Sequence, residues 1–236
     1  MRAVVLAAGD GGRLDPYTAS LPKPLVPLNG RAIVDYTLGA LADAGVQDVT
    51  VITGYREAQL RKALNATTPR GLAMTFVSNA QFHRGASYSL RAARARMAGE
   101  PFLLVMADHM LAPEIIRVLE AAYAALPGCS YVAADSSKHD EAYTEEATRL
   151  KIEGRRVTGI GKRLREWQAL DAGAFVVAPE AWETIDAAPE DCELSTIFGM
   201  LAARGELLAA DVSGSFWYDI DTAEDLANAS ALLAGV

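Results

Sequence analysis

Short apolar runs alternate with segments of helical periodicity along the first half of the chain. The runs end in glycine or polar residues, which is typical of strands that are buried on both faces. These predicted strands cover residues 3–8, 49–53, 74–77 and 102–107. Apolar residues at helical spacing predict helices at 33–42, 55–65, 87–97 and 113–125. This alternation predicts a parallel sheet with helices on both faces.

The second half of the chain has shorter predicted strands in a less regular order. They cover residues 130–134, 149–152, 156–160, 174–178, 207–212 and 216–220. Helices are predicted at 179–185, 194–204 and 222–233. No linker, low-complexity segment or internal repeat interrupts the pattern. We therefore predict one α/β domain over residues 1–236, with a mixed sheet in its second half.

The composition is that of an ordinary globular protein, with 51% apolar and 22% charged residues among 236. No stretch reaches the roughly 20 apolar residues that a membrane span needs. The first predicted strand begins at Arg2, which leaves no room for a signal peptide. Cys129 and Cys192 lack metal-ligand spacing, so we interpret them as buried small side chains in a reducing compartment. We expect a cytoplasmic protein that has no membrane partner.

The net charge of −8 argues against nucleic acid as a partner, because phosphate backbones attract basic surfaces. The charge is unevenly distributed. Residues 1–34 carry four basic and two acidic side chains, whereas residues 205–236 carry six acidic side chains and no Lys or Arg. A cationic start and an anionic end suit a site where phosphate and metal meet. A solvated acidic helix would also explain Glu224 and Asp225.

The loop after the first predicted strand is rich in glycine; residues 6–25 read LAAGDGGRLDPYTASLPKPL. It lacks the third glycine of the dinucleotide-binding pattern and the Gly-Lys-Ser/Thr of the Walker pattern. Gly9, Gly11 and Gly12 could serve a tight turn only. Their bare backbone also allows several N–H groups to surround one anion.

Two cations favour the anion-binding interpretation of this loop. Arg13 follows the glycines and can donate a fork of hydrogen bonds to phosphate oxygens. Lys23 lies between Pro22 and Pro24, whose rings restrict the backbone and therefore the position of the ammonium group. We predict that the loop binds the triphosphate of a nucleotide.

Aspartates near the ends of two predicted strands are candidate ligands of a divalent cation. Asp108 follows strand 102–107, and Asp219 and Asp221 precede the last helix. A hard cation prefers carboxylate oxygens together with phosphates. Each aspartate could instead cap a turn or a helix, and the sequence after Asp221 has the pattern of a helix start. Ligands bind at the carboxyl ends of strands in such sheets, where Asp108 and the glycine loop both fall.

The pattern Leu6-Ala7-Ala8-Gly9-x-Gly11-x-Arg13-Leu14, followed by Pro22-Lys23-Pro24, resembles the signature of nucleotidyltransferases that activate sugar and alcohol phosphates, a superfamily with MobA-like members. The resemblance implies a Rossmann-like, three-layer α/β/α sandwich around a mixed, mainly parallel sheet, of the nucleotide-diphospho-sugar transferase type. It implies catalytic roles for Arg13 and Lys23, and Mg²⁺ held by Asp108 and Asp221, with Asp219 a weaker candidate for support. It also implies nucleotide contacts from Leu6, Ala8, Gly9, Gly11 and Gly12. Gly12 stands where most members have Thr or Ser, so backbone N–H groups should compensate.

A second segment, SNAQFHRGASYSL at residues 78–90, resembles the nucleoside-binding segment of the same family. The resemblance implies contacts to a pyrimidine from Asn79, Gly85, Ser87 and Ser89. Ser87 would equally be a favoured helix cap. Residues 105–110, 159–164, 169–177 and 216–226 most resemble cytidylyltransferases that act on inositol-1-phosphate, with phosphocholine and phosphonate enzymes close by.

Lys162 and Asp171 match acceptor-binding positions of that group. Lys162 would bind the phosphate or phosphonate and Asp171 would accept from hydroxyls; a surface lysine and a strand-start aspartate are the alternatives. Trp217 and Tyr218 could enclose a choline-like cation, or they could pack in the core. The nucleotide would then bind to about residues 1–127 and the acceptor to about residues 128–236.

The resemblance implies a Mg²⁺-dependent cytidylyltransferase that transfers CMP from CTP to a small phospho- or phosphono-alcohol. An acceptor phosphate is already an anion near neutral pH, so no general base is needed. This fits a chain with only His83, His109 and His139, and we expect a supporting role for His109. The alternatives are a sugar-1-phosphate or molybdopterin nucleotidyltransferase using another NTP, and a regulatory module that binds nucleotide without turnover. The chain is a stand-alone protein or one domain of a bifunctional one, working with a second biosynthetic enzyme.

Overall fold

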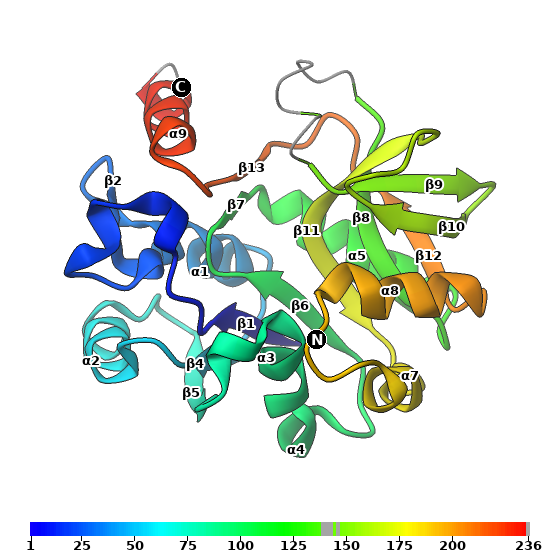
Figure 1. Cartoon of the computed structure of the whole chain (residues 1–236), viewed down its shortest axis with the longest axis horizontal. Coiled ribbons are helices and arrows are strands. Elements are labelled where there is room, and N and C mark those ends of the chain that lie inside the picture. The colour runs from blue at the N-terminus through cyan, green and yellow to red at the C-terminus, as the bar shows by residue number, and fades with distance from the viewer. Residues whose placement is uncertain (138–143, 145–146, 235–236) are drawn as a thin grey trace.

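The computed structural model describes residues 1–137, 144 and 147–234; His139 lies outside these residues. The strands are β1 (Arg2–Ala7), β2 (Pro27–Leu28), β3 (Arg31–Ala32), β4 (Asp48–Thr53), β5 (Ala73–Ser78), β6 (Phe102–Met106), β7 (His109–Leu111), β8 (Ser130–Asp135), β9 (Arg149–Glu153), β10 (Arg156–Gly161), β11 (Ala169–Val177), β12 (Leu207–Asp211) and β13 (Trp217–Asp219). The helices are α1 (Ile33–Asp43), α2 (Glu57–Thr67), α3 (Ala86–Ala92), α4 (Arg94–Met97), α5 (Pro113–Ala125), α7 (Ala181–Ala187), α8 (Leu194–Ala203) and α9 (Ala223–Ala234) (Figure 1).

One sheet runs through both halves of the described chain, in the order β5-β4-β1-β6-β11-β8-β12-β10-β9. The pairs β4–β5, β1–β4, β1–β6 and β8–β12 are parallel. β11 is antiparallel to both β6 and β8, and β10 is antiparallel to both β12 and β9. Seven of these nine strands therefore run in one direction. This confirms the predicted mixed, mainly parallel sheet.

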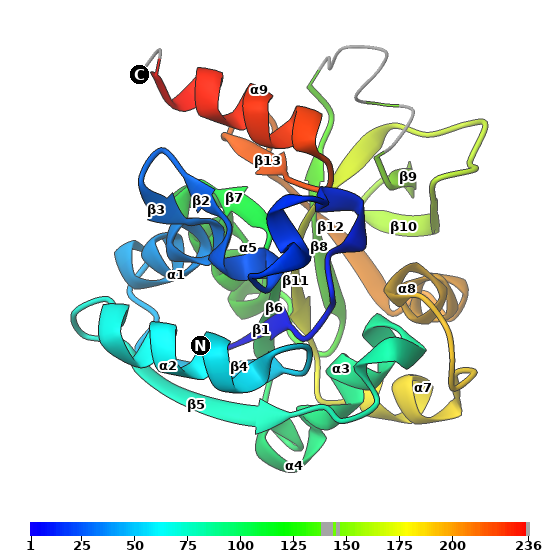
Figure 2. The same ribbon diagram turned by 60° about the vertical axis from the view of Figure 1, so that its left-hand side comes forward.

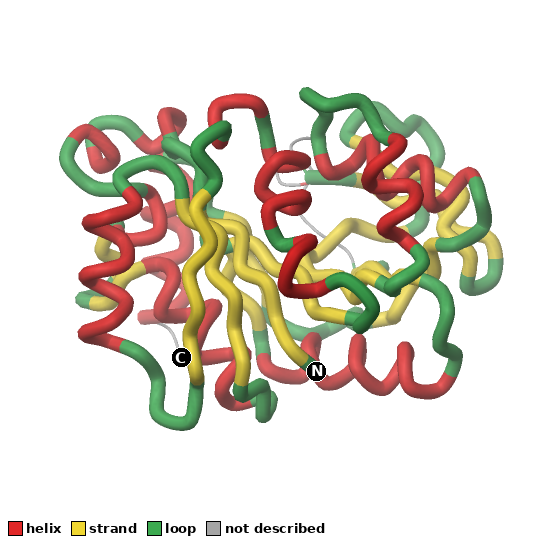
Figure 3. The backbone as a smooth tube through the Cα atoms, turned by 90° about the horizontal axis from the view of Figure 1, so that it is seen from below, coloured by secondary structure: helices red, strands yellow, loops and turns green. Residues whose placement is uncertain are grey.

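Helices cover both faces of the sheet, which gives three layers (Figure 3). Alternate strand residues point to opposite faces: Val5 packs with α1, α2 and α5, whereas Val4 and Leu6 pack with α3, α4, α7 and α8. β1, β4 and β6 are largely buried on both faces for this reason, as predicted. The predicted strand 74–77 differs, because it lies in β5 at the edge of the sheet and is only half-buried. Within the described part of the chain, no helix has the length and apolar character that crossing a membrane requires.

A small third cluster joins the beginning of the chain to its end. Leu14, Val26 and Leu28 from the segment after β1 pack against Ile220 and Leu226 from the segment around α9. The Asn29 side chain also donates to the Ser230 carbonyl at 3.1 Å. In Figures 1 and 2, α9 accordingly lies beside the segment that follows β1. This packing places the cationic start and the anionic end of the chain together.

The structure corrects several boundaries and one burial assignment. The predicted helix 87–97 divides into α3 and α4. β11 begins five residues before the predicted 174, and the short strands β2, β3 and β7 were not predicted, because strands of two or three residues carry no readable periodicity. Cys192 is buried as expected, but Cys129 is only half-buried, since it lies in the turn before β8.

Candidate active site

The loop after β1 is held in place by side chains from inside and outside itself. The Thr18 hydroxyl lies 2.8 Å from Asp15 Oδ1 and 3.2 Å from the Gly11 carbonyl oxygen. From the position just before α2, the Arg56 guanidinium donates to the Ala19 carbonyl at 2.8 Å. The loop contains three short 3-10 turns, at Gly12–Leu14, Tyr17–Ala19 and Lys23–Leu25. The loop is therefore preorganised by contacts that require no ligand.

A short β-ladder brings the two predicted metal ligands together across 113 positions of sequence. β13 pairs antiparallel with β7, so that Asp219 lies opposite His109. The Ile220 N–H continues the ladder by donating to the Asp108 carbonyl at 3.2 Å. Asp221 consequently lies next to Asp108, at the carboxyl end of β6.

The contacts at the start of α9 show whether Asp221 caps this helix, which was the alternative to metal binding. Asp225 Oδ2 accepts from the N–H groups of Asp221 and Thr222 at 3.1 and 2.7 Å, and the Asp225 N–H lies 3.2 Å from the Thr222 hydroxyl. Thr222 and Asp225 therefore form the helix cap. The Asp221 carboxylate is left to face the loop after β1.

The Lys23 ammonium lies between the two carboxylates. Its Nζ is 2.7 Å from Asp108 Oδ2 and 2.7 Å from Asp221 Oδ1, and Arg13 Nη2 is 2.7 Å from Asp221 Oδ2. Burial opposes the charge of Lys23, but Asp108 and Asp221 outweigh it and raise the pKa of Lys23. Burial likewise opposes the charges of Asp108 and Asp221, yet Lys23 holds the pKa of Asp108 well below its usual range and also lowers the pKa of Asp221. Lys23, Asp108 and Asp221 therefore stay charged near neutral pH.

A cavity of about 440 Å³ opens above this cluster. The cavity is lined by the glycines of the loop, by the cations Arg13 and Lys23, and by the carboxylates of Asp108 and Asp221. The full lining is Leu6, Ala7, Gly9, Asp10, Gly11, Gly12, Arg13, Lys23, Pro24, Ala107, Asp108 and Asp221. Of the residues predicted to bind the nucleotide phosphates, only Ala8 is missing; it is buried, and its carbonyl accepts from the Tyr55 N–H at 2.9 Å. The glycine-rich loop and two basic side chains thus line one space.

The carboxylates suit a divalent cation. Asp108 and Asp221 contact the same Lys23 nitrogen, so they are within reach of one small cation. Asp219 Oδ1 is buried and accepts no hydrogen bond among the described residues, and one ligand atom each of Asp108, His109 and Asp219 lie within 4.8 Å of one another. Oxygen donors of this kind fit Mg²⁺. His109 Nδ1, at 3.5 Å, is too distant for a charge-assisted hydrogen bond to Asp219 Oδ1, and a buried carboxylate oxygen without a hydrogen bond favours a nearby cation.

Burial shifts the titration of the neighbouring groups. It raises the pKa of Asp219 to about 6 and that of Asp171 to about 7. Burial opposes the charge on His109, but Asp219 and Asp108 outweigh it and raise the pKa of His109 to about 9. His109 is therefore protonated near neutral pH and is a poor general base.

A larger cavity, of about 1670 Å³, adjoins the first and shares Arg13 and Asp221 with it. Both predicted acceptor residues, Lys162 on the segment after β10 and Asp171 on β11, line this cavity. Its floor includes Phe175 and Phe198, whose rings stack with centroids 4.0 Å apart. The cavity therefore offers charged groups around an apolar base.

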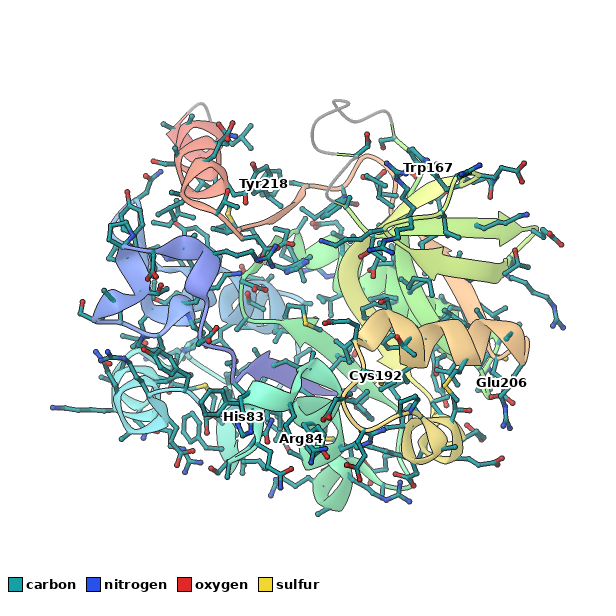
Figure 4. The ribbon with its side chains drawn as sticks, in the orientation of Figure 1. His83, Arg84, Trp167, Cys192, Glu206 and Tyr218 are labelled. Carbon is teal, nitrogen blue, oxygen red and sulfur yellow. The ribbon has the colours of Figure 1, made fainter. Side chains whose placement is uncertain are left out.

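The two aromatic residues of β13 differ in their surroundings, although both line the larger cavity. Trp217 is 7% exposed, belongs to the core, and donates from Nε1 to Asp135 Oδ2 at 2.8 Å. Tyr218 is half-buried and lies between α9 and the β9–β10 hairpin in Figure 4. Core packing accounts for Trp217 without a bound cation.

The side chains predicted to bind the nucleoside line neither cavity. Asn79 Nδ2 donates to Ser89 Oγ at 3.1 Å, and Ser87 Oγ donates to the Glu190 carbonyl at 2.8 Å. All three side chains are buried. Gly85 precedes α3 with φ +103°, and its neighbour Ala86 lines the larger cavity. The three polar side chains therefore shape this segment, while Ala86 lines the larger cavity.

Ion pairs fasten this segment to the turn before α8. Arg84 Nε is 2.6 Å from Asp191 Oδ1 and its Nη2 is 2.7 Å from Glu190 Oε2. Figure 4 shows Arg84 and Cys192 on these two adjoining segments. Glu193 and Ser195, which follow this turn, line the larger cavity. Sequence reasoning missed both, and it missed Arg163, which only its place beside Lys162 could have indicated.

A family model described as "MobA-like NTP transferase domain" matches residues 3–204 of this chain. Among curated proteins, the "Bifunctional IPC transferase and DIPP synthase" of Rubrobacter xylanophilus is 34% identical over 99% of this chain and 52% of its own length. The protein of the same name from Aquifex aeolicus is 30% identical over 98% of this chain and 51% of its own length. The chain thus spans about half the length of these curated relatives.

A solved structure gives the same architecture. The inositol-1-phosphate CTP transferase from T. maritima superposes with a TM-score of 0.85, covering 99% of this chain and 94% of that one, at 24% identity. At that identity the similarity concerns the fold alone.

Proposed function

The chain belongs to the family of MobA-like NTP transferase domains, and we propose that it is a Mg²⁺-dependent cytidylyltransferase. It transfers CMP from CTP to a small phosphorylated alcohol of the inositol-1-phosphate class and releases pyrophosphate. The proposal includes one nucleotidyltransferase domain, with the nucleotide bound mainly by residues 1–127 and the acceptor by residues 128–236. The second activity in the names of its bifunctional relatives is not part of this proposal.

One observation carries the proposal: Lys23 Nζ lies 2.7 Å from carboxylate oxygens of both Asp108 and Asp221, beside the glycine loop. Phosphate-binding cations and metal-binding carboxylates must be adjacent in such an enzyme, because the metal and the phosphates contact each other. Two of these residues come from opposite ends of the chain. Core packing alone does not require such a set of buried charges.

The chemistry is an in-line displacement at the α-phosphorus. An oxygen of the acceptor phosphate forms a bond to that phosphorus, and the bond to the bridging oxygen of the β-phosphate breaks. Pyrophosphate leaves with the electron pair of the broken bond. The acceptor oxygen is already ionised near neutral pH, so this step needs no base, which agrees with the protonated state of His109.

In this proposal, the basic residues around the smaller cavity bind the phosphates and the acidic residues bind the metal. Arg13 and Lys23 orient the phosphates and neutralise charge that develops in the transition state. Asp108 and Asp221, with Asp219 beside them, would hold the Mg²⁺, which supplies further charge neutralisation at the phosphates. Lys23 would exchange its carboxylate contacts for phosphate contacts when the metal-bound nucleotide enters. The N–H groups of residues 9–12 complete the anion site.

The choice of CTP and of the acceptor class rests on similarity and on the second cavity. The fold neighbour named above is an inositol-1-phosphate CTP transferase. Lys162 and Arg163 give the larger cavity cations for an acceptor phosphate, and Asp171 gives it an acceptor for hydroxyls. A phosphorylated polyol has both kinds of group.

Pyrophosphate release measures the proposed reaction directly. The protein is incubated with Mg²⁺, each of four NTPs, and a panel of inositol-1-phosphate, phosphocholine, 2-aminoethylphosphonate and sugar-1-phosphates. We expect pyrophosphate with CTP and inositol-1-phosphate, released about 10²- to 10³-fold more slowly after Lys23→Ala at matched concentration. Release only with another NTP and a sugar-1-phosphate would replace the proposal by that activity. Tight CTP binding without release from any acceptor would indicate a regulatory module.

A further inference from the structure

The imidazole of His109 faces two carboxylates of the candidate metal site. Its Nδ1 is 3.0 Å from Asp108 Oδ1 and 3.5 Å from Asp219 Oδ1. Carboxylates only accept, so Nδ1 carries a hydrogen and donates it to Asp108. Asp108 Oδ2 is meanwhile bound by Lys23. Both oxygens of Asp108 are therefore fixed, one by a loop cation and one by this ring.

The opposite edge of the ring packs against Gly173 of β11. A Cβ on Gly173 would be 2.0 Å from His109 Cδ2 and 2.2 Å from its Nε2, and Gly173 has φ +74°. The register of β11 against β8 shifts between Asp171 and Phe175, around this glycine. A side chain at position 173 would thus displace the ring. The position of the His109 ring therefore depends on the absence of a side chain at Gly173, in the irregular part of β11.

The same distortion carries the acceptor-side aspartate. Asp171 Oδ1 accepts from the Gly173 N–H at 2.8 Å, and Asp171 lines the larger cavity. The Thr37 hydroxyl donates to the His109 carbonyl at 2.7 Å, which fixes the backbone on the other side. His109 therefore spans the space between the metal-side carboxylates and the strand segment that presents Asp171.

We propose that His109 is a positioning residue that orients Asp108 and Asp219 for the divalent cation and couples them to the Gly173 segment of the acceptor cavity. The inference rests on the proposed function, because it concerns the same reaction. His109 touches no reacting atom in this role; it acts through Asp108. Comparable outer groups that orient metal ligands contribute about 10- to 100-fold to metal affinity or activity.

The first test replaces the ring in two ways. We titrate Mn²⁺ by electron paramagnetic resonance in the presence of α,β-methylene-CTP, using wild type, His109→Ala and His109→Asn. Alanine should weaken Mn²⁺ binding by at least about tenfold. Asparagine, whose amide can donate to Asp108 from nearly the same place, should recover most of this loss. Binding of the metal-free nucleotide in EDTA should stay within about twofold for all three, because His109 orients metal ligands only.

The second test moves the ring without removing it. Gly173→Ala should push His109 aside and weaken Mn²⁺ binding as His109→Ala does. The double variant should be no worse than His109→Ala alone, because the methyl group then fills the space left by the ring. Gly128→Ala is the matched control: Gly128 also has positive φ, +94°, but its Cβ would meet nothing within 4 Å. Its Mn²⁺ affinity should equal that of wild type.

The outcomes separate this inference from the proposed function. If wild type releases pyrophosphate but His109→Ala keeps its Mn²⁺ affinity, the positioning role is wrong and the enzyme assignment stands. Additive losses in the double variant, or an asparagine variant no better than alanine, would also overturn the role. A wild type that binds no Mn²⁺ with the nucleotide analogue contradicts the proposed function, and this inference with it.

Discussion

Gly11 lies directly against the Lys23 side chain. A Cβ on Gly11 would be 2.5 Å from Lys23 Cβ and 3.1 Å from its Cγ and Cδ, and Gly11 has φ +69°. A glycine is therefore required at position 11 for two reasons: the backbone is left-handed there, and the Lys23 side chain occupies the space of a Cβ. The position of the ammonium between two carboxylates depends on this contact.

Gly11→Ala should accordingly displace Lys23 and lower turnover by about 10- to 100-fold, because a preorganised cation leaves its place. Gly30→Ala is the control, since Gly30 has φ +82° but open space around its Cβ. Both variants bear the backbone strain, of about 1 kcal/mol, and only Gly11→Ala should lose turnover. Equal activities of the two variants in the pyrophosphate assay would contradict the role of the contact.

Lys23→Met removes the ammonium while keeping the length of the stem. Asp108 and Asp221 then face each other without a cation, and the metal-free protein should lose roughly 3 kcal/mol of unfolding free energy. Turnover should fall by about 10²- to 10³-fold. Mg²⁺ should raise the melting temperature of this variant more than that of wild type, because the metal replaces the missing charge.

The control for Lys23→Met is Lys62→Met, at an exposed position of α2. It should change neither turnover nor the response of the melting temperature to Mg²⁺. Near-normal turnover of Lys23→Met would refute the assignment of Lys23.

Arg13→Ala should separate catalysis from stability. The Arg13 side chain is 62% exposed, so its ion pair with Asp221 is screened by water and contributes at most about 0.5 kcal/mol. Turnover should nevertheless fall by about 10²-fold, because in the proposed reaction the guanidinium neutralises charge on the phosphates. Arg117→Ala, at a half-exposed position of α5, should leave turnover unchanged. A large loss of stability in Arg13→Ala would mean that the residue is structural.

Asp171→Asn should change how stability depends on pH. Burial raises the pKa of Asp171 to about 7 in the folded protein, against about 3.9 in the unfolded chain. Between these values the folded state binds the extra proton, so Asp171 makes stability fall as pH rises from about 4 to about 7. The asparagine keeps an oxygen for the Gly173 N–H and does not titrate.

The measurement is the unfolding free energy of both proteins in EDTA from pH 4.5 to 8. His109 and Asp219 face Asp171 and are present in both proteins, and Asp171 helps to raise the pKa of His109. The difference between the two curves therefore reports Asp171 together with its coupling to these two groups. As pH rises to about 7, the unfolding free energy of Asp171→Asn should increase relative to that of wild type. Above pH 7 the difference should stay constant. Parallel curves would show that Asp171 titrates normally.

The grouping of the glycine loop with Lys23 and Asp108 was predictable from sequence. Glycines, Arg13 and Lys23 follow β1 within a few residues, and Asp108 ends β6, which pairs with β1. Strand order and direction then bring them together. The structure places all of them at one cavity.

Long-range pairings were not predictable in the same way. Asp221 reaches Asp108 through the pairing of β13 with β7. A strand was predicted at 216–220, but its partner β7 has only three residues and leaves no periodic pattern. Ser87 suggested a ligand contact, yet its hydroxyl bonds to the carbonyl of Glu190, 103 residues away. The fit of His109 against Gly173 depends on atomic spacing that single-sequence patterns do not encode.

The most direct test is a crystal structure with Mn²⁺ and α,β-methylene-CTP, using anomalous scattering to locate the metal. We predict one Mn²⁺ bound to Asp108 and Asp221, phosphates in contact with residues 9–13, and Lys23 turned from the carboxylates to a phosphate oxygen. A nucleotide bound away from the glycine loop, or a metal that contacts neither aspartate, would contradict the account.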